Sequence, residues 1–179
     1  GPGAGAVLAG TPGTFYQDQA NPDSFPAYRE LLFETSIPDI AALLFACENI
    51  WLMYEQIWLK DGADTRRTPW HQDLPYLPAT GEHLAVMWTC LDSVAKDDSL
   101  EFVRGSHRGP LYNPSAFNPD DVSANLFSGD EWPQLPDVDA APNEYPLLSW
   151  AMDPGDVVVF HPAMLHGGAQ TRAGIRRRT

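Results

Sequence analysis

The chain has 179 residues, a length that suits one domain with a buried core. Hydrophobic residues make up 44% of it and aromatic residues 11%, which excludes a disordered or fibrous protein. The 24 acidic residues outnumber the 11 basic ones and leave a formal net charge of −13. Nucleic acids and anionic membrane surfaces are bound by clustered Lys and Arg, so this charge argues against both as partners.

Two isolated thiols, Cys47 and Cys90, show no CxxC spacing. A disulfide framework or a structural zinc site is therefore not expected, and a reducing cytoplasm is the expected compartment. No stretch reaches the roughly 18 consecutive apolar residues of a membrane span. The sequence stops directly after an arginine run, and we expect a truncation at the C-terminus.

The first part of the chain predicts a flexible arm followed by two helices. Residues 1–20 are rich in Gly, Ala and Thr and predict the arm, while residues 21–179 predict a single domain. Within that domain, residues 26–34 place their apolar side chains on one side of a helix. Ser36, followed by an early proline and an acid, predicts the N-cap of a second helix that continues to Cys47.

From residue 50 onward the sequence has strand character, with β-branched and aromatic residues in alternation. The expected strands cover residues 50–59, 70–73, 83–91, 100–103, 150–152 and 156–161. Between them, residues 112–145 are rich in Pro, Asn, Asp and Ser and predict a long irregular loop. Many strands with few helices indicate a mostly β protein. A double-stranded β-helix (a jelly-roll or cupin-like barrel) with N-terminal flanking helices accounts for this pattern.

Two histidines and one carboxylate form a candidate metal site. His71 and Asp73 are two positions apart, and residues with this spacing in a β-strand point to the same face. His166 comes from a distant expected strand and is followed by two glycines, which allow close approach of the backbone. Two imidazoles and one carboxylate are the ligand set of a non-haem Fe(II) site with open coordination positions.

An arginine run, Arg176, Arg177 and Arg178, follows the last of these histidines. Arginine binds a carboxylate through a fixed two-pronged fork, as a dianionic cosubstrate would require. If the run is a strand, Arg177 faces opposite to its two neighbours and is the expected inward residue. The choice among the three stays open at this stage.

Five short segments occur together within residues 50–179. They are Gln-Ile-Trp-Leu-Lys at 56–60, Pro-Trp-His-Gln-Asp at 69–73, Gly-Ser-His at 105–107, Pro-Gly-Asp at 154–156 and His-Gly at 166–167. In this combination they resemble the phytanoyl-CoA dioxygenase family. Members of that family are Fe(II)- and 2-oxoglutarate-dependent oxygenases on a double-stranded β-helix. Two positions depart from the family pattern, because Arg104 stands where a proline is usual and Asp98-Ser99 where Asn-Gly is usual.

The resemblance implies a set of roles for particular residues. The implied Fe(II) ligands are His71, Asp73 and His166. A salt bridge from Arg177 to the distal carboxylate of 2-oxoglutarate is implied as well. The implied pocket residues near the cosubstrate or substrate are Gln56, Lys60 and Trp88. With Fe(II), 2-oxoglutarate and O2, such a protein hydroxylates a small organic molecule and releases succinate and CO2.

Two other hypotheses about the function stay open. One is a cupin-like metalloenzyme that does not use 2-oxoglutarate, although such sites usually add a third histidine or a glutamate close to the first pair. The other is a catalytically silent domain that binds a ligand or a partner protein. A silent domain predicts damaged metal ligands, whereas all three candidate ligands are intact here.

Overall fold

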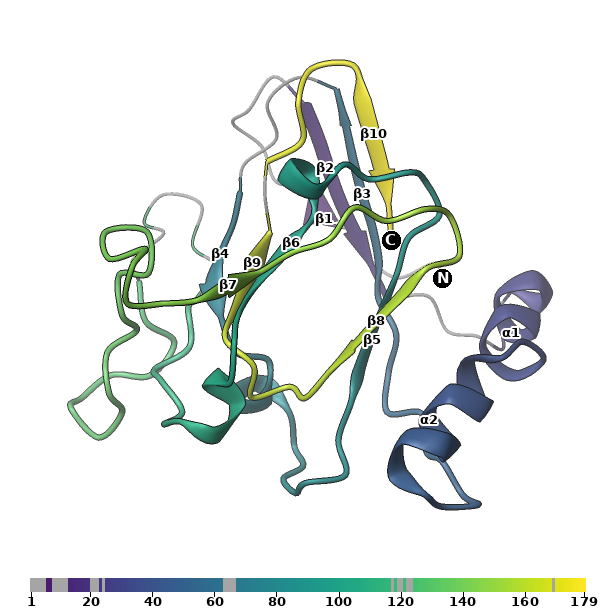
Figure 1. Ribbon diagram of the computed structural model, residues 1–179, viewed down its shortest axis with the longest axis horizontal. Helices are drawn as coiled ribbons and strands as arrows, with labels where there is room; N and C mark the ends of the chain where they lie inside the picture. Colours follow the sequence, from purple (N-terminus) through teal and green to yellow (C-terminus); the bar gives the residue numbers. More distant parts are fainter. Residues whose placement is uncertain are drawn as a thin grey trace.

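The structure is a computed structural model that describes residues 6–7, 13–19, 23, 25–62, 67–116, 118, 121, 124–168 and 170–179. Two helices, α1 (Pro26–Phe33) and α2 (Ile37–Phe45), lie outside the strands, as Figure 1 shows. Both were expected. Ser36 occupies the N-cap position of α2 but makes no capping bond through its side chain. The Thr35 hydroxyl accepts a hydrogen bond from the Ile37 N–H instead, at 3.3 Å.

The described strands are short and follow one another along almost the whole chain. They are β1 (Ala6–Val7), β2 (Gly13–Asp18), β3 (Ile57–Gly62), β4 (Thr68–His71), β5 (Val86–Thr89), β6 (Leu100–Val103), β7 (Leu147–Leu148), β8 (Val157–Phe160), β9 (His166–Gly168) and β10 (Ile175–Arg178). Three short 3-10 helices, η2 (Leu74–Tyr76), η3 (Lys96–Asp98) and η4 (Ser106–Arg108), lie in the connections between them.

These strands form two facing layers (Figure 1). One layer has the order β1-β2-β3-β10 and the other has the order β4-β9-β6-β7, while β5 and β8 pair with each other. The Leu91 N–H, just after β5, donates to the Arg178 carbonyl at 2.9 Å and so joins the β5-β8 pair to β10. From β3 to β10 the chain crosses repeatedly between the two layers. This topology confirms the expected mostly β double-stranded β-helix with flanking helices.

Several strands are shorter than the sequence pattern predicted. Each covers only the residues that pair with a neighbouring strand. The strand expected over residues 50–59 starts only at Ile57, since β2 pairs with residues 57–62 and leaves residues 50–56 without a ladder. The strand expected over residues 83–91 is confined to Val86–Thr89, which is the part that faces β8. In the segment 150–152 only Met152 is paired, through an isolated bridge to Val94. Periodicity shows where a strand is possible, but the partner decides its length.

The prediction that residues 1–20 form a flexible arm is wrong for residues 13–18. Residues 13–18 form β2, which pairs with all six residues of β3. Phe15 lies opposite Lys60, is 8% exposed, and stacks on Trp58 with ring centroids 5.4 Å apart. The buried aromatic ring contributes a large apolar surface to the sheet, and Thr14, Phe15 and Tyr16 are residue types that favour strands. Residues 1–5, 8–12 and 20 lie outside the described part.

The core consists of small clusters rather than one continuous mass. In one of them Trp70, Val103, Val138 and Leu165 pack together, and in another Cys90, Val94 and Met152 do. The first cluster includes Val138 from the long segment 112–145, so part of this segment is packed on the domain. Gly168 has Leu100 and Thr68 atoms 3.2–3.4 Å from the place of a Cβ. The glycines after His166 therefore serve close strand packing.

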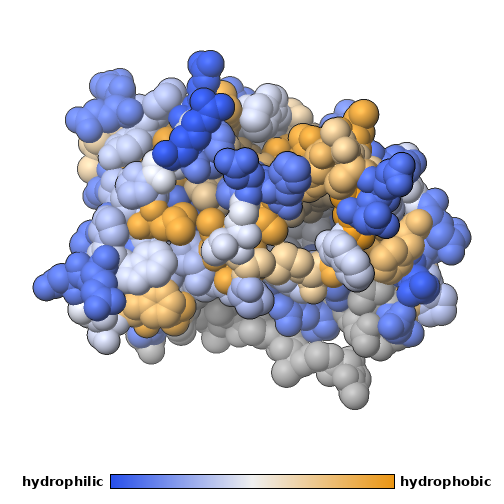
Figure 2. Space-filling view, turned by 90° about the horizontal axis from the view of Figure 1, so that it is seen from below, coloured by the Kyte–Doolittle hydropathy of each residue, from blue (hydrophilic) through white to orange (hydrophobic). Residues whose placement is uncertain are grey.

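The lower face of the molecule carries exposed apolar side chains. Figure 2 shows hydrophobic residues gathered there, several of them on the side where α1 and α2 lie in Figure 1. Leu43 of α2 is 84% exposed and Trp51 is 88% exposed. In the described part of the chain, no helix has the length and apolar character needed to cross a membrane.

Leu165→Ala is expected to lower the free energy of unfolding by about 2–5 kcal/mol, because it leaves a cavity beside Trp70 and Val103. Urea unfolding followed by tryptophan fluorescence measures this change. The matched control is Leu43→Ala, the same substitution at an exposed position, with an expected change within about 0.5 kcal/mol. Equal losses in the two variants would contradict the assigned core.

Candidate metal centre

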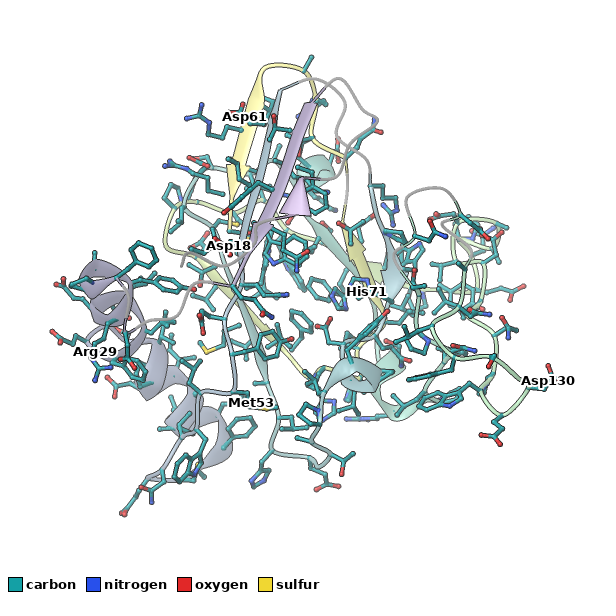
Figure 3. The ribbon with its side chains drawn as sticks, turned by 180° about the vertical axis from the view of Figure 1, so that it is seen from behind. Asp18, Arg29, Met53, Asp61, His71 and Asp130 are labelled. Atoms are coloured by element: carbon teal, nitrogen blue, oxygen red, sulfur yellow. The ribbon has the colours of Figure 1, made fainter. Side chains whose placement is uncertain are left out.

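The two histidines of the predicted site face each other across one strand pair. His71 ends β4 and His166 begins β9, and these residues are direct partners in the antiparallel register. Their rings are 4.2 Å apart between centroids, and they are 9% and 5% exposed. Figure 3 shows that His71 points into the space between the strand layers, whereas Asp130 lies at the outer tip of the long loop.

Asp73 completes the group from a position just beyond β4. One carboxylate oxygen is 3.4 Å from His71 Nε2 and the other is 3.7 Å from His166 Nε2. The expected geometry of two residues on one face of a strand is wrong here, since Asp73 has helical backbone angles (φ −79°, ψ −30°) at the start of η2. The Asp73 N–H donates to the Pro162 carbonyl at 2.8 Å, and this bond fixes the turn.

Each histidine is oriented by its own backbone. His71 Nδ1 is 2.8 Å from the Pro69 carbonyl, and His166 Nδ1 is 2.9 Å from the Met164 carbonyl. A carbonyl only accepts, so both Nδ1 atoms carry the proton, and both Nε2 atoms face the Asp73 carboxylate, where a metal ion would bind. An oriented second nitrogen of this kind is the usual support of a metal-binding imidazole.

The electrostatics of the group favour its metal-binding protonation states. Burial, and then the nearby His71, lower the pKa of His166 to about 4, so its ring is neutral at neutral pH. Burial tends to raise the pKa of Asp73. The contacts of its carboxylate with His71 and His166 outweigh burial, and the pKa of Asp73 lies below its ordinary value.

The donor atoms of the group suit one metal ion. They all lie within 4.8 Å of one another, and in the described part of the chain this is the one group of at least three such side chains that does so. Ligands bound to one ion at about 2 Å lie about 3 Å apart, so a small contraction is enough to hold it. Two imidazoles and one carboxylate match a non-haem Fe(II) site.

The arginine run forms strand β10, and only its middle residue points inward. Arg177 is 6% exposed, whereas Arg176 and Arg178 are exposed and pair with Asp61 and Asp92 at 2.9 and 2.6 Å. A guanidinium nitrogen of Arg177 donates to the backbone carbonyl of Asp98. Burial lowers the pKa of Arg177 below its ordinary value, but so basic a group keeps its charge.

Lys60 lies beside this arginine. It is the register partner of Arg177 across β3 and β10, and it is 2% exposed. Its ammonium group donates to the Thr68 hydroxyl at 3.3 Å and lies 4.8 Å from the centroid of the Phe15 ring. Burial, followed by the charges of Arg177 and Arg67, lowers the pKa of Lys60 to about 7. The interior therefore holds two adjacent cationic groups.

The other predicted pocket residues differ in how firmly the structure places them. Trp88 of β5 lies with its ring centroid 6.0 Å from the guanidinium carbon of Arg177. Gln56 is partly buried directly before β3 and makes no hydrogen bond among those described. For Tyr54, which is outside that predicted set, burial and then the charge of Asp73 raise the pKa of the phenol.

Two residues that support the site were missed by the sequence reasoning. Asp98 is 3% exposed, and its carboxylate binds Arg172 at 2.6 Å while its carbonyl receives Arg177. Gln72 is 2% exposed and makes three hydrogen bonds to other segments. The only available signal was the place of Gln72 between two ligands. Asp98 was noted only as a departure from the family pattern, without a role.

The remaining histidines do not join the metal group. His161 uses both ring nitrogens, with the Gly81 carbonyl at 3.0 Å and the Ala163 N–H at 3.1 Å, as a structural residue would. The His107 ring is 6.3 Å from the His161 ring. Arg104 is exposed, and its backbone N–H donates to the Pro146 carbonyl.

Comparison with known proteins agrees with this geometry. The family model described as phytanoyl-CoA dioxygenase (PhyH) matches residues 37–179. The chain belongs to this family. It is 29% identical over 162 residues to peroxisomal phytanoyl-CoA dioxygenase of Rattus norvegicus, covering 86% of the chain and 45% of the relative. It is also 29% identical over 137 residues to a probable α-ketoglutarate-dependent hypophosphite dioxygenase of Stutzerimonas stutzeri, covering 75% and 44%. The chain thus spans less than half the length of these relatives.

Solved structures show the same fold at low sequence identity. The non-haem α-ketoglutarate-dependent carbocyclase SnoK from nogalamycin biosynthesis aligns with a TM-score of 0.71 and 19% identity, covering 98% of this chain and 65% of SnoK. EvdO2 from Micromonospora carbonacea, complexed with 2-oxoglutarate, aligns with a TM-score of 0.62 and 22% identity, covering 97% and 73%.

Asp73→Ala is expected to weaken Co(II) binding by more than about 100-fold, because it removes the one anionic ligand of the group. Titration of metal-free protein with Co(II), followed by visible absorption, measures the dissociation constant. The control is Asp130→Ala, which removes a carboxylate at the outer tip of the long loop (Figure 3) and should leave the constant unchanged. Similar weakening in both would mean that net charge alone attracts the metal.

Proposed function

We propose that this chain carries the catalytic centre of an Fe(II)- and 2-oxoglutarate-dependent dioxygenase that hydroxylates a small organic molecule. The observation that carries the proposal is the convergence of His71, Asp73 and His166, together with the burial of the Arg177 guanidinium. The register partner of Arg177, Lys60, donates to Thr68 of β4, the strand that ends at His71. A 2-His-1-carboxylate group with a buried cation nearby suits a metal and a dicarboxylate together. Membership in the phytanoyl-CoA dioxygenase family supports the same function.

The residues of the site would divide the work between metal and cosubstrate. His71, Asp73 and His166 would hold Fe(II), which supplies the activation of O2 coupled to oxidative decarboxylation of 2-oxoglutarate to succinate and CO2. Arg177 would bind the distal carboxylate, and its bond to the Asp98 carbonyl holds the guanidinium in place. Lys60 would add a second positive charge, and Trp88 would form a wall beside Arg177. Gln56 remains a predicted pocket residue.

The surroundings of the ligands would keep the reaction apart from water. Phe160 and Phe102 lie against His166, with ring centroids 4.8 and 5.9 Å from it. These aromatic rings exclude water from one side of the histidine and restrict its motion. The carboxylate of Asp73 would take a coordination position that a halide needs, which favours hydroxylation over halogenation.

A cupin-like enzyme that does not use 2-oxoglutarate is the alternative function. Such sites usually have a fourth protein ligand, and the described residues bring no further His, Cys, Asp or Glu into this group. Neither that alternative nor a silent binding domain explains why Arg177 is buried beside Lys60. We therefore favour the 2-oxoglutarate-dependent reaction.

The setting of the protein is likewise a proposal. We expect a reducing compartment such as the cytoplasm, since Cys47 and Cys90 are both free and Cys90 is buried. Several relatives are named as peroxisomal. The partner we expect is a small-molecule substrate, and the net charge of −13 still argues against nucleic acid and anionic membranes.

Arg177→Leu is expected to weaken 2-oxoglutarate binding by about 30-fold or more, which corresponds to roughly 2 kcal/mol for loss of a buried charged partner. Anaerobic titration of the Fe(II)-loaded protein, followed by the visible charge-transfer band of the 2-oxoglutarate chelate, gives the dissociation constant. Arg176→Leu is the matched control, because this neighbour in β10 is exposed and pairs with Asp61. A band that saturates equally in both variants would assign the anchor elsewhere, and iron binding without any band would favour the alternative function.

We expect the binding of 2-oxoglutarate to depend on pH because of Lys60. Its pKa is about 7 without cosubstrate, and a bound dianion would favour the protonated form and raise this pKa. The affinity should be highest below about pH 7 and fall, by at most about tenfold per pH unit, as the pH rises above 7. Calorimetric titration of 2-oxoglutarate into Mn(II)-loaded protein between about pH 6 and about pH 9 measures it. In Lys60→Met the fall above pH 7 should disappear, and an unchanged profile would exclude Lys60 as its source.

A further inference from the structure

Gln72 stands between two proposed metal ligands, yet its side chain serves other parts of the fold. It is 2% exposed, among the most buried large side chains in the described part of the chain. Its two neighbours, His71 and Asp73, belong to the metal group. A buried amide is costly unless its donors and acceptor are satisfied, so the partners of this side chain are informative.

The amide of Gln72 joins three segments that are distant in sequence. Its nitrogen donates to the Ala163 carbonyl at 2.8 Å and to the Pro110 carbonyl at 3.2 Å. Its oxygen accepts from the Tyr112 N–H at 2.9 Å. Both N–H groups and the oxygen are thus used, and each partner is a backbone group that has to be paired when buried.

Two of these segments matter directly for the proposed reaction. Ala163 lies in the turn that leads into His166, and the same turn accepts the Asp73 and Leu74 N–H groups at Pro162. Pro110 and Tyr112 lie at the entrance of the long loop 112–145, whose Val138 packs into the core with Trp70 and Leu165. One side chain therefore connects the segment of the first two ligands, the turn before the third ligand, and the base of the loop.

We propose that Gln72 is a positioning residue that couples the long loop 112–145 to the metal centre. Because the turn before His166 and the loop entrance share one amide, a shift in either changes the hydrogen bonds of the other. Metal binding then restrains the loop entrance, and an ordered loop entrance improves metal binding. This inference rests on the proposed function for its metal site, but its test does not require turnover.

Gln72→Leu keeps a side chain of similar size and removes all three bonds. We expect its Co(II) dissociation constant to rise about tenfold or more, as for loss of residues that orient metal ligands. In the native protein, Co(II) should slow hydrogen exchange at the Tyr112 amide, and this response should be lost in the variant. Visible absorption and exchange mass spectrometry give the two readouts.

Asn113→Leu is the matched control. Asn113 is a buried amide, 1% exposed, at the same end of the loop, but among the described residues its side chain bonds to the Phe127 backbone alone, at 2.8 and 3.2 Å. Asn113→Leu should lower the free energy of unfolding. It should leave the Co(II) dissociation constant within about threefold of the native value, and Co(II) should still slow hydrogen exchange at the Tyr112 amide. Equal effects of Asn113→Leu and Gln72→Leu on both readouts would overturn the proposal, because they would show a general loss of packing.

Gln72→Glu keeps the test decisive if Gln72→Leu does not fold. It has the same shape and still accepts from the Tyr112 N–H, but it places a carboxylate against the Ala163 and Pro110 carbonyls. Weaker Co(II) binding in this variant supports the proposal, and native affinity with a native Tyr112 response overturns it. Failure of 2-oxoglutarate to bind the metal-loaded native protein would contradict the proposed function without changing this comparison.

Discussion

The antiparallel pairing of β4 with β9 is the interaction on which the site depends. It sets His71 directly opposite His166, and the backbone carbonyls of Pro69 and Met164 then turn both Nε2 atoms toward one point. A slip of one residue in this register would send one histidine to the other face of the sheet. Gly167 has the Thr68 carbonyl 3.1 Å from the place of a Cβ, so glycine is needed for this close approach.

A second constraint is the burial of positive charge in the same interior. A cation taken out of water is costly unless something compensates it, and Lys60 and Arg177 are register partners with almost no exposed surface. The Thr68 hydroxyl, the Asp98 carbonyl and the rings of Phe15 and Trp88 supply polar and cation–π contacts. The proposed dianion would complete the compensation, which explains why a protein with so few basic residues keeps two of them here.

Much of this could be predicted from the sequence, because the relevant chemistry is carried by residue type and spacing. The helices, the strand at residues 100–103, the three residues of the candidate metal group and the inward direction of Arg177 follow from local patterns. Strand ends could not be predicted, since β3 and β5 extend only as far as their partners. β2 was missed because the Gly and Ala residues before it dominated the composition of residues 1–20, although Thr14, Phe15 and Tyr16 favour a strand and Phe15 packs on Trp58.

The sequence by itself determined which chemical groups the protein has for a metal and a dicarboxylate, and the alternation that makes a β fold possible. Only the tertiary structure decided how these groups meet. Asp73 reaches the histidines from a turn held by Pro162, not from a strand, and Gln72 and Asp98 gain their roles from partners far away in the chain. Hydrogen bonds between distant backbone segments leave no local pattern, and for this physical reason they appear only when the chain is folded.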